Sequence, residues 1–255
     1  MNKRFLNIIE SLEACKGDIG FYYKNLVTGE ELGYNEDKEF MAASVIKLPI
    51  FAVVMKKVAE GSLDLNMKIA VREEDIVPSC GAINLYSTPP VLDLKTLCNF
   101  MIALSDNTAT NLVIDLFGIE KLNEEFSEIG FEKTHLERYL FDREASKLGY
   151  ENYFVPTEIG ILLEKLYKND FVNRETSEEM LRVLKMQKIN HKIPGLMKGK
   201  YEVAHKTGED DGISNDVGIV FCKEPFIVVF ASNNANVGEF ENLIRQISLQ
   251  LTMEQ

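Results

Sequence analysis

Ser44 and Lys47 are spaced so that a hydroxyl and an amine can act together. They stand at the start of an apolar run, residues 48–54, that is typical of a buried helix. Residues three apart share a face of a helix, so the Lys47 amine can reach the Ser44 hydroxyl. A serine hydroxyl is a weak nucleophile until a base takes its proton, and a desolvated lysine can be that base. The pair therefore predicts covalent catalysis, although Ser-x-x-Lys alone is a common chance pattern.

Two further tripeptides place polar groups at the ends of predicted elements. Ser105-Asp106-Asn107 lies between two predicted helices, and Lys206-Thr207-Gly208 ends a predicted strand. Alone, the first is a typical helix N-cap cluster and the second a typical strand-end turn. Together with Ser-x-x-Lys, in this order and at these places, they resemble the motif set of the penicillin-recognising serine enzymes.

Hydrophobic periodicity predicts the elements that must position these motifs. An amphipathic helix comes first, a β-hairpin over 19–34 second, and the Ser44 helix, to about residue 60, third. Residues 62–92 are predicted as loops and short extended pieces. The next elements are helices at 94–104, 108–116, 119–128, 156–167 and 178–186, strands at 203–205, 216–221 and 226–231, and a helix over 240–251.

This order predicts an α/β fold of the α+β kind. The terminal helices are expected to cover an antiparallel sheet, and the helical middle is expected to form an inserted lobe. We predict one domain over residues 1–255, with an α/β lobe at about 1–60 and 195–255 and an all-helical lobe at about 61–194.

Composition excludes several classes of partner. The net charge of −12 argues against nucleic acid or an anionic membrane surface. No apolar stretch is long enough for a membrane span, and the N-terminus is predicted as an amphipathic helix rather than a signal peptide. The predicted location is cytoplasmic, or secreted or periplasmic if a leader precedes this sequence.

The cysteines and histidines are scattered along the chain, so they predict no metal site. They are Cys15, Cys80, Cys98, Cys222, His135, His191 and His205.

With these motifs, the sequence resembles the class A β-lactamases and their penicillin-binding D,D-peptidase relatives over nearly its whole length. Thr108-Ala109-Thr110-Asn111-Leu112 directly after Ser-Asp-Asn, and Pro156 at the start of a helix, add to the resemblance. It implies a five-stranded antiparallel sheet flanked by the terminal helices, with the site between this part and the helical lobe.

The resemblance implies a role for each catalytic side chain. Ser44 is the expected acylated nucleophile, and Lys47 the acceptor of its proton. Ser105 is expected to relay a proton to the leaving nitrogen, with help from Lys206. Because two lysines that lie close together lower each other's pKa, Lys206 would also help Lys47 to act as a base. No cofactor or metal is expected.

The same resemblance implies the residues that bind the substrate. Asn107 is expected to hydrogen-bond the amide side chain of the substrate, and Thr207 to face its carboxylate. Gly208 completes Lys-Thr-Gly. The backbone N–H of Glu209 is expected to form the oxyanion hole with that of Ser44, and such donors contribute a large electrostatic term.

The sequence departs from the family in the loop before Pro156, where class A β-lactamases carry the glutamate that activates the deacylating water. One alignment places Leu140 there, and a count back from Pro156 places Tyr139 there; neither is a carboxylate. Asp142 or Glu144 could supply the base from a rearranged loop, or both could be solvated loop charges.

A second departure concerns the substrate carboxylate. The family often binds it with an arginine, and the matching position is about Asn215. The run Glu209-Asp210-Asp211 brings negative charge to the rim and would repel an anionic substrate. Lys192 could supply the missing positive charge from another loop.

We therefore expect a serine hydrolase that forms an acyl-enzyme on Ser44 with a small β-lactam or peptidyl substrate. Hydrolysis of β-lactam antibiotics is the first expectation, with slow deacylation because the loop carboxylate is not evident. A D,D-peptidase or esterase of the penicillin-binding type is the alternative. A protein that traps a β-lactam or peptide without turnover, as a sensor, is the alternative from another class.

Overall fold

A computed structural model describes residues 3–78 and 80–253 of the chain; residues 1–2, 79 and 254–255 lie outside this description. The helices are α1 (Lys3–Glu13), η1 (Ala43–Ile46, 3₁₀), α2 (Lys47–Ala59), η2 (Glu73–Asp75, 3₁₀), η3 (Ile83–Leu85, 3₁₀), α3 (Leu94–Ala103), α4 (Asn107–Phe117), α5 (Ile119–Ile129), α6 (Arg143–Lys147), α7 (Pro156–Tyr167), α8 (Arg174–Leu184) and α9 (Val237–Met253). The strands are β1 (Asp18–Asn25), β2 (Glu31–Tyr34), β3 (Phe40–Met41), β4 (Lys68–Ala70), β5 (Val91–Asp93), β6 (Tyr153–Phe154), β7 (Glu202–Asp210), β8 (Ile213–Phe221) and β9 (Phe226–Asn233). No helix in these residues combines the length and the apolar character that crossing a bilayer needs.

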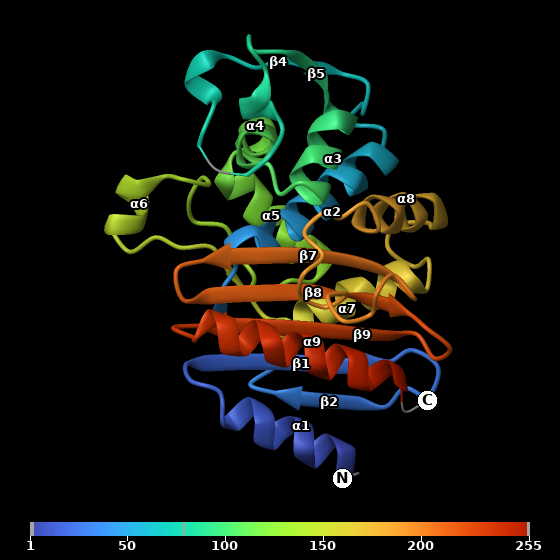
Figure 1. Cartoon of the computed structure of the whole chain (residues 1–255). Helices are drawn as coiled ribbons and strands as arrows, with labels where there is room; N and C mark the ends of the chain where they lie inside the picture. Colours follow the sequence, from blue (N-terminus) through green and yellow to red (C-terminus); the bar gives the residue numbers. More distant parts are fainter. Residues whose placement is uncertain (1–2, 79, 254–255) are drawn as a thin grey trace.

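The main sheet has five strands in the order β2-β1-β9-β8-β7, and all neighbours are antiparallel. Figure 1 shows this sheet as a stack of strands from β2 at one edge to β7 at the other. The prediction of a five-stranded antiparallel sheet is therefore confirmed. Because β7 is an edge strand, one side of its backbone faces away from the sheet.

Each face of the sheet is covered by helices. On one face, Phe21 and Phe230 pack under the buried residues of α1 and α9, among them Ile8 and Ile244. Figure 1 shows α9 crossing the sheet on this side. On the other face, Tyr22 belongs to the larger core that contains α2 and α7. Side chains alternate across a strand, so a central strand such as β1 must be apolar on both faces.

The region between α2 and β7 is mainly helical, and Figure 1 shows α3, α4 and α5 grouped near α2, beyond the β7 edge. The prediction that this lobe is all-helical is wrong in part, because β4 and β5 form a two-stranded ribbon and β6 pairs with β3. α8 starts at Arg174, earlier than predicted, because the Asn173 side chain accepts a hydrogen bond from Thr176 N and caps it. A short helix, α6, forms within the loop that precedes Pro156, where no helix is predicted.

α2 is the central buried helix, with Leu48, Ile50 and Val54 fully buried. Pro49 lies in its first turn, where the missing N–H removes no helical hydrogen bond. The sequence therefore places the buried helix directly behind Ser44.

Candidate active site

Ser44 lies in η1, one 3₁₀ turn that leads into α2. Residues i and i+3 eclipse in a 3₁₀ turn, so Ser44 and Lys47 are brought together directly. The Lys47 Nζ lies 2.8 Å from Ser44 Oγ, which confirms the predicted contact. Ala43, just before the serine, has a φ of 42°, a strained conformation for a residue with a side chain. This strain is consistent with a nucleophile that the surroundings hold in place.

The Lys47 amine is completely buried and surrounded by oxygen atoms. Its Nζ lies 2.7 Å from Ser105 O, 3.2 Å from Ser105 Oγ and 2.6 Å from Asn107 Oδ1. Burial lowers the pKa of Lys47 to about 7, although Cys80 and Asp106 act to raise it. A neutral amine has a lone pair, so Lys47 can accept the proton of Ser44 near neutral pH.

Ser105 connects Lys47 to the second lysine. Its Oγ lies 3.0 Å from Lys206 Nζ, which also donates to Thr207 O at 2.7 Å. Burial lowers the pKa of Lys206 well below its usual value, and the charge of Lys47 lowers it further. The expected lysine–lysine effect therefore acts on Lys206, whereas burial is what lowers the pKa of Lys47. A continuous hydrogen-bonded path joins Ser44, Lys47, Ser105 and Lys206.

Asp106 holds the loop that presents Ser105. Its carboxylate accepts hydrogen bonds from Ala109 N, at the start of α4, and from Ala82 N and Ile83 N, at the start of η3. A side chain on Gly81, which has a φ of 127°, would collide with this carboxylate. Ser105 itself has a φ of 57°, which is rare for a residue with a side chain. The N-cap interpretation of Ser-Asp-Asn is thus correct for Asp106, while its neighbours face the cleft.

The end of β7 lies against the Ser44 turn. A Cβ atom on Gly208 would lie 2.7 Å from Ala42 O, so only glycine permits this approach. Thr207 and Glu209, on either side of Gly208, line a cavity together with Ser44. The backbone N–H groups of Ser44 and Glu209 remain the predicted oxyanion hole.

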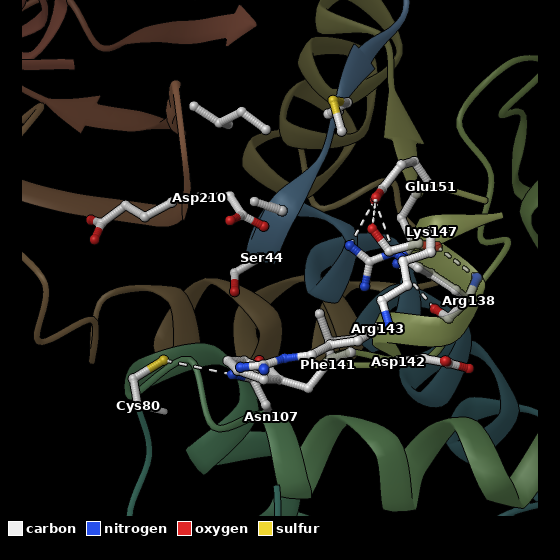
Figure 2. Close-up of a pocket in the computed structure, with 17 residues that line it drawn as sticks. Ser44, Cys80, Asn107, Arg138, Phe141, Asp142, Arg143, Lys147, Glu151 and Asp210 are labelled. Atoms are coloured by element: carbon white, nitrogen blue, oxygen red, sulfur yellow. Dashed lines mark hydrogen bonds and ion pairs between the residues drawn. The ribbon is translucent and has the colours of Figure 1, made fainter. Parts of the chain in front are cut away.

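Two cavities meet at Ser44, one of about 600 Å³ and one of about 350 Å³. Figure 2 shows the larger one, with Ser44 beside it. The residues that line both cavities are Ser44, Cys80, Glu209 and Asp210. The larger cavity adds Met41, Ala43, Asn107, Arg138, Leu140, Phe141, Asp142, Arg143, Ser146, Lys147, Glu151, Asn152 and Ile213. The smaller cavity adds Ser105, Ile189 and Thr207.

The loop of residues 138–152 brings Leu140, not Tyr139, to the larger cavity. The backbone of Leu140 is held on both sides by Asn111, whose Oδ1 accepts from Leu140 N at 2.9 Å and whose Nδ2 donates to Leu140 O at 3.0 Å. The side chain of Tyr139 instead forms a hydrogen bond with Asp115. Burial, followed by this hydrogen bond, raises the pKa of Tyr139. Of the two alignments of this loop, the structure supports the one at Leu140.

The two carboxylates proposed for deacylation are placed differently. Asp142 lines the larger cavity, but its Oδ1 accepts a hydrogen bond from Ala145 N and caps α6. Glu144 is exposed, pairs with Lys147 at 2.7 Å and does not line either cavity. The structure therefore does not bring Glu144 to Ser44, and it gives Asp142 a structural role.

Neither of the residues considered for the substrate carboxylate lines either of the two cavities that meet at Ser44. Asn215 is buried, and its Nδ2 donates to Met41 O at 2.9 Å and to Ala42 O at 3.3 Å. Lys192 is also buried, with its Nζ 3.0 Å from Glu209 Oε1 and 3.1 Å from Asn215 O. Lys192 therefore neutralises Glu209 behind the site instead of reaching into the cleft.

One group of described side chains could hold a metal ion, because ligand atoms of His191, Glu209 and Glu241 lie within 4.8 Å of one another. Each carboxylate already has a cationic neighbour. Lys192 lies 3.0 Å from Glu209, and Arg245 Nη1 lies 3.8 Å from Glu241 Oε2. A divalent ion would add charge to a group that is already neutral, which disfavours metal binding.

Three residues of the site were not identified from the sequence. Cys80 lines both cavities, and its Sγ lies 3.2 Å from Ser105 O. Arg143 lines the larger cavity, and Asn111 holds Leu140. Only Asn111 had a signal in the sequence, since it belongs to the segment directly after Ser-Asp-Asn that adds to the resemblance.

Comparisons with known proteins agree with this geometry. A family described as "Beta-lactamase enzyme family" matches residues 2–254. The chain is similar to β-lactamase VEB-1 of Pseudomonas aeruginosa, at 26% identity over 95% of this chain and 87% of that protein. It is also similar to the solved structure of PBP-A, at 28% identity and a TM-score of 0.88, over 99% of this chain and 95% of that chain. A leucine-to-glutamate mutant of PBP-A, solved as an acyl-enzyme complex with penicillin G, has 28% identity and a TM-score of 0.87 over 98% and 94% of the two chains.

Proposed function

The chain belongs to the β-lactamase enzyme family, and we propose that it is a serine hydrolase that forms an acyl-enzyme on Ser44 and opens the ring of β-lactams. The observation that carries this proposal is the buried Lys47 amine, 2.8 Å from Ser44 Oγ and with a pKa lowered to about 7. A lysine whose pKa lies near physiological pH and that contacts a partly exposed serine is suited to general-base catalysis.

In the proposed acylation, Lys47 Nζ takes the proton of Ser44 and the Oγ attacks the carbonyl carbon of the lactam. The C–N bond of the tetrahedral intermediate then breaks. The leaving nitrogen receives a proton from Ser105 Oγ. Lys47 or Lys206 then gives a proton back to Ser105 Oγ. The short hydrogen bonds along this path support such a relay because each proton moves between atoms already in contact.

We propose that the acyl-enzyme is hydrolysed slowly. Leu140 lines the cavity at the place where the family's deacylating glutamate is expected. The Asp142 carboxylate caps α6 by accepting a hydrogen bond from Ala145 N, and Glu144 is exposed to solvent. Without a positioned base, attack by water loses a factor of about 10²–10⁴.

A D,D-peptidase or esterase is the second candidate, favoured by the similarity to PBP-A and by Leu140. The edge strand β7, which ends beside Ser44, could pair with an extended peptide. Burst kinetics separates the candidates. Multiple turnovers of a chromogenic cephalosporin support a β-lactamase. A stable one-to-one adduct, with turnover of a D-alanyl peptide thioester, supports the peptidase; an adduct without any turnover supports a sensor.

Acylation is expected to depend on pH through Lys47. The amine acts as a base only when deprotonated, so the acylation rate should rise as pH increases through about 7 and level off above it. At two pH units below the pKa, about 1% of the lysine is neutral, which predicts a rate about 100-fold lower. Stopped-flow acylation between pH 5 and 9 measures this. A rate that falls as pH rises through 7 would contradict the role of Lys47.

Alkylation of Cys80 is expected to block acylation, because this exposed thiol lines both cavities beside Ser44. N-ethylmaleimide should therefore abolish adduct formation with benzylpenicillin. The matched control is Cys80→Ser, which should acylate normally before and after the same treatment. Equal loss in the treated serine variant would show that another site causes the inhibition.

A further inference from the structure

The proposed acylation assigns a different part of the substrate to each of the two cavities that meet at Ser44. Ser105, the proton donor to the leaving nitrogen, lines the smaller cavity, so the leaving group belongs there. Asn107 lines the larger cavity, which would receive the acyl side chain. The larger cavity also extends along the loop of residues 138–152. Groups on this loop can therefore select among acyl side chains.

Three cations line the larger cavity, and two of them already have carboxylate partners. Arg138 donates from Nε and Nη2 to Glu151 at 2.9 and 2.7 Å. Lys147 lies 2.7 Å from Glu144. In contrast, no hydrogen bond or ion pair within residues 3–78 and 80–253 involves the Arg143 guanidinium. In Figure 2, the Arg143 side chain extends from the loop over the cavity, on the side of Asn107.

The opposite wall of the cavity is acidic. Asp210, at the end of β7, has no cationic partner among the described residues, and Asp211 follows it. Glu209 is neutralised by Lys192. An anionic group on the acyl side chain would be repelled from the Asp210 wall and attracted to Arg143. The two walls together would orient such a group, because like charges disfavour one orientation and opposite charges favour the other.

We infer that Arg143 is a specificity-determining residue that binds a carboxylate on the acyl side chain of the substrate. The preferred substrates are then acyl donors whose acyl part carries a carboxylate. A guanidinium suits this role because its planar donors match a carboxylate. This inference rests on the proposed acylation of Ser44.

Two penicillins provide a matched pair of probes. Benzylpenicillin and carboxybenzylpenicillin differ by one carboxylate on the acyl side chain and share the carboxylate of the leaving part. The measured quantity is the ratio of their second-order acylation rate constants. For an exposed ion pair, Arg143→Gln is expected to lower the carboxybenzyl-to-benzyl ratio about 5-fold. The control, Lys147→Gln, removes a cation of the same loop that is already paired and should leave the ratio unchanged. Raising NaCl from 0.05 to 0.5 M should lower the ratio in the wild type but not in Arg143→Gln, since salt screens exposed charges.

The outcomes are distinct. A ratio that Arg143→Gln does not change would overturn the inference while the proposed function stands. An equal fall in Lys147→Gln would also overturn it, because the loop's overall charge would then be the cause. Failure of the wild type to acylate with either penicillin would overturn the proposed function, and the inference with it.

Discussion

Ser44→Ala is expected to abolish adduct formation and to lower β-lactam turnover on the order of 10⁶-fold, the size of the loss when the nucleophile of a serine protease is removed. Ser44 Oγ is the hydroxyl that the Lys47 amine contacts at the meeting point of both cavities. The variant should fold, because Lys47 keeps its hydrogen bonds to Ser105 O and Asn107 Oδ1. Steady-state hydrolysis of a chromogenic cephalosporin measures the loss.

A matched control for this variant is Ser62→Ala. Ser62 is exposed beyond the end of α2, where its hydroxyl donates to Lys57 O. This variant should keep wild-type kinetics, and circular dichroism should show the same fold for both variants. Turnover in Ser44→Ala above about 1% of the wild-type rate would mean that another group attacks the substrate.

Leu140→Glu is expected to speed hydrolysis of the acyl-enzyme by about 10²–10⁴-fold, the usual contribution of a positioned general base. The Leu140 side chain lines the larger cavity with Ser44, and Asn111 holds its backbone on both sides. A carboxylate at this position would therefore project from a fixed point towards the acyl group and could activate a water. The measurement is the decay of the benzylpenicillin adduct by intact mass after removal of excess reagent.

Two control variants show whether base catalysis causes the change. In Leu140→Gln, the glutamine has nearly the shape of glutamate but cannot act as a base, so the adduct should still decay slowly. Tyr139→Glu moves the carboxylate one residue, to a side chain that turns towards Asp115, and should also leave it slow. If the adduct of Leu140→Glu decays at the wild-type rate, Leu140 does not occupy the place of the deacylating base.

The main elements of the fold could be predicted from the sequence because local signals agree with the packing. Pro156 opens α7 as predicted, since proline is favoured in the first turn of a helix. Residues 217–220 of β8 and 226–231 of β9 are apolar and buried on both faces, as in strands covered on both sides, although both strands extend further than predicted. Ser44 and Lys47 could be paired because the i, i+3 spacing determines contact in any tight helical turn.

The remaining features depend on contacts between distant parts of the chain. Spacing alone could not show that burial, rather than Lys206, lowers the pKa of Lys47. The choice between Leu140 and Tyr139 depends on Asn111, about thirty residues away in sequence. Cys80 reaches the site because Asp106 binds the loop after it, and an exposed loop residue has no periodic pattern to reveal such a contact.

Intact-mass spectrometry of the wild-type protein with benzylpenicillin, followed by peptide mapping, tests the central claim most directly. The proposal predicts a one-to-one adduct with the mass of the whole penicillin, located on the peptide that contains Ser44 and lost slowly by hydrolysis. An adduct on Cys80 or another residue would contradict it, as would the absence of both adduct and hydrolysed penicillin.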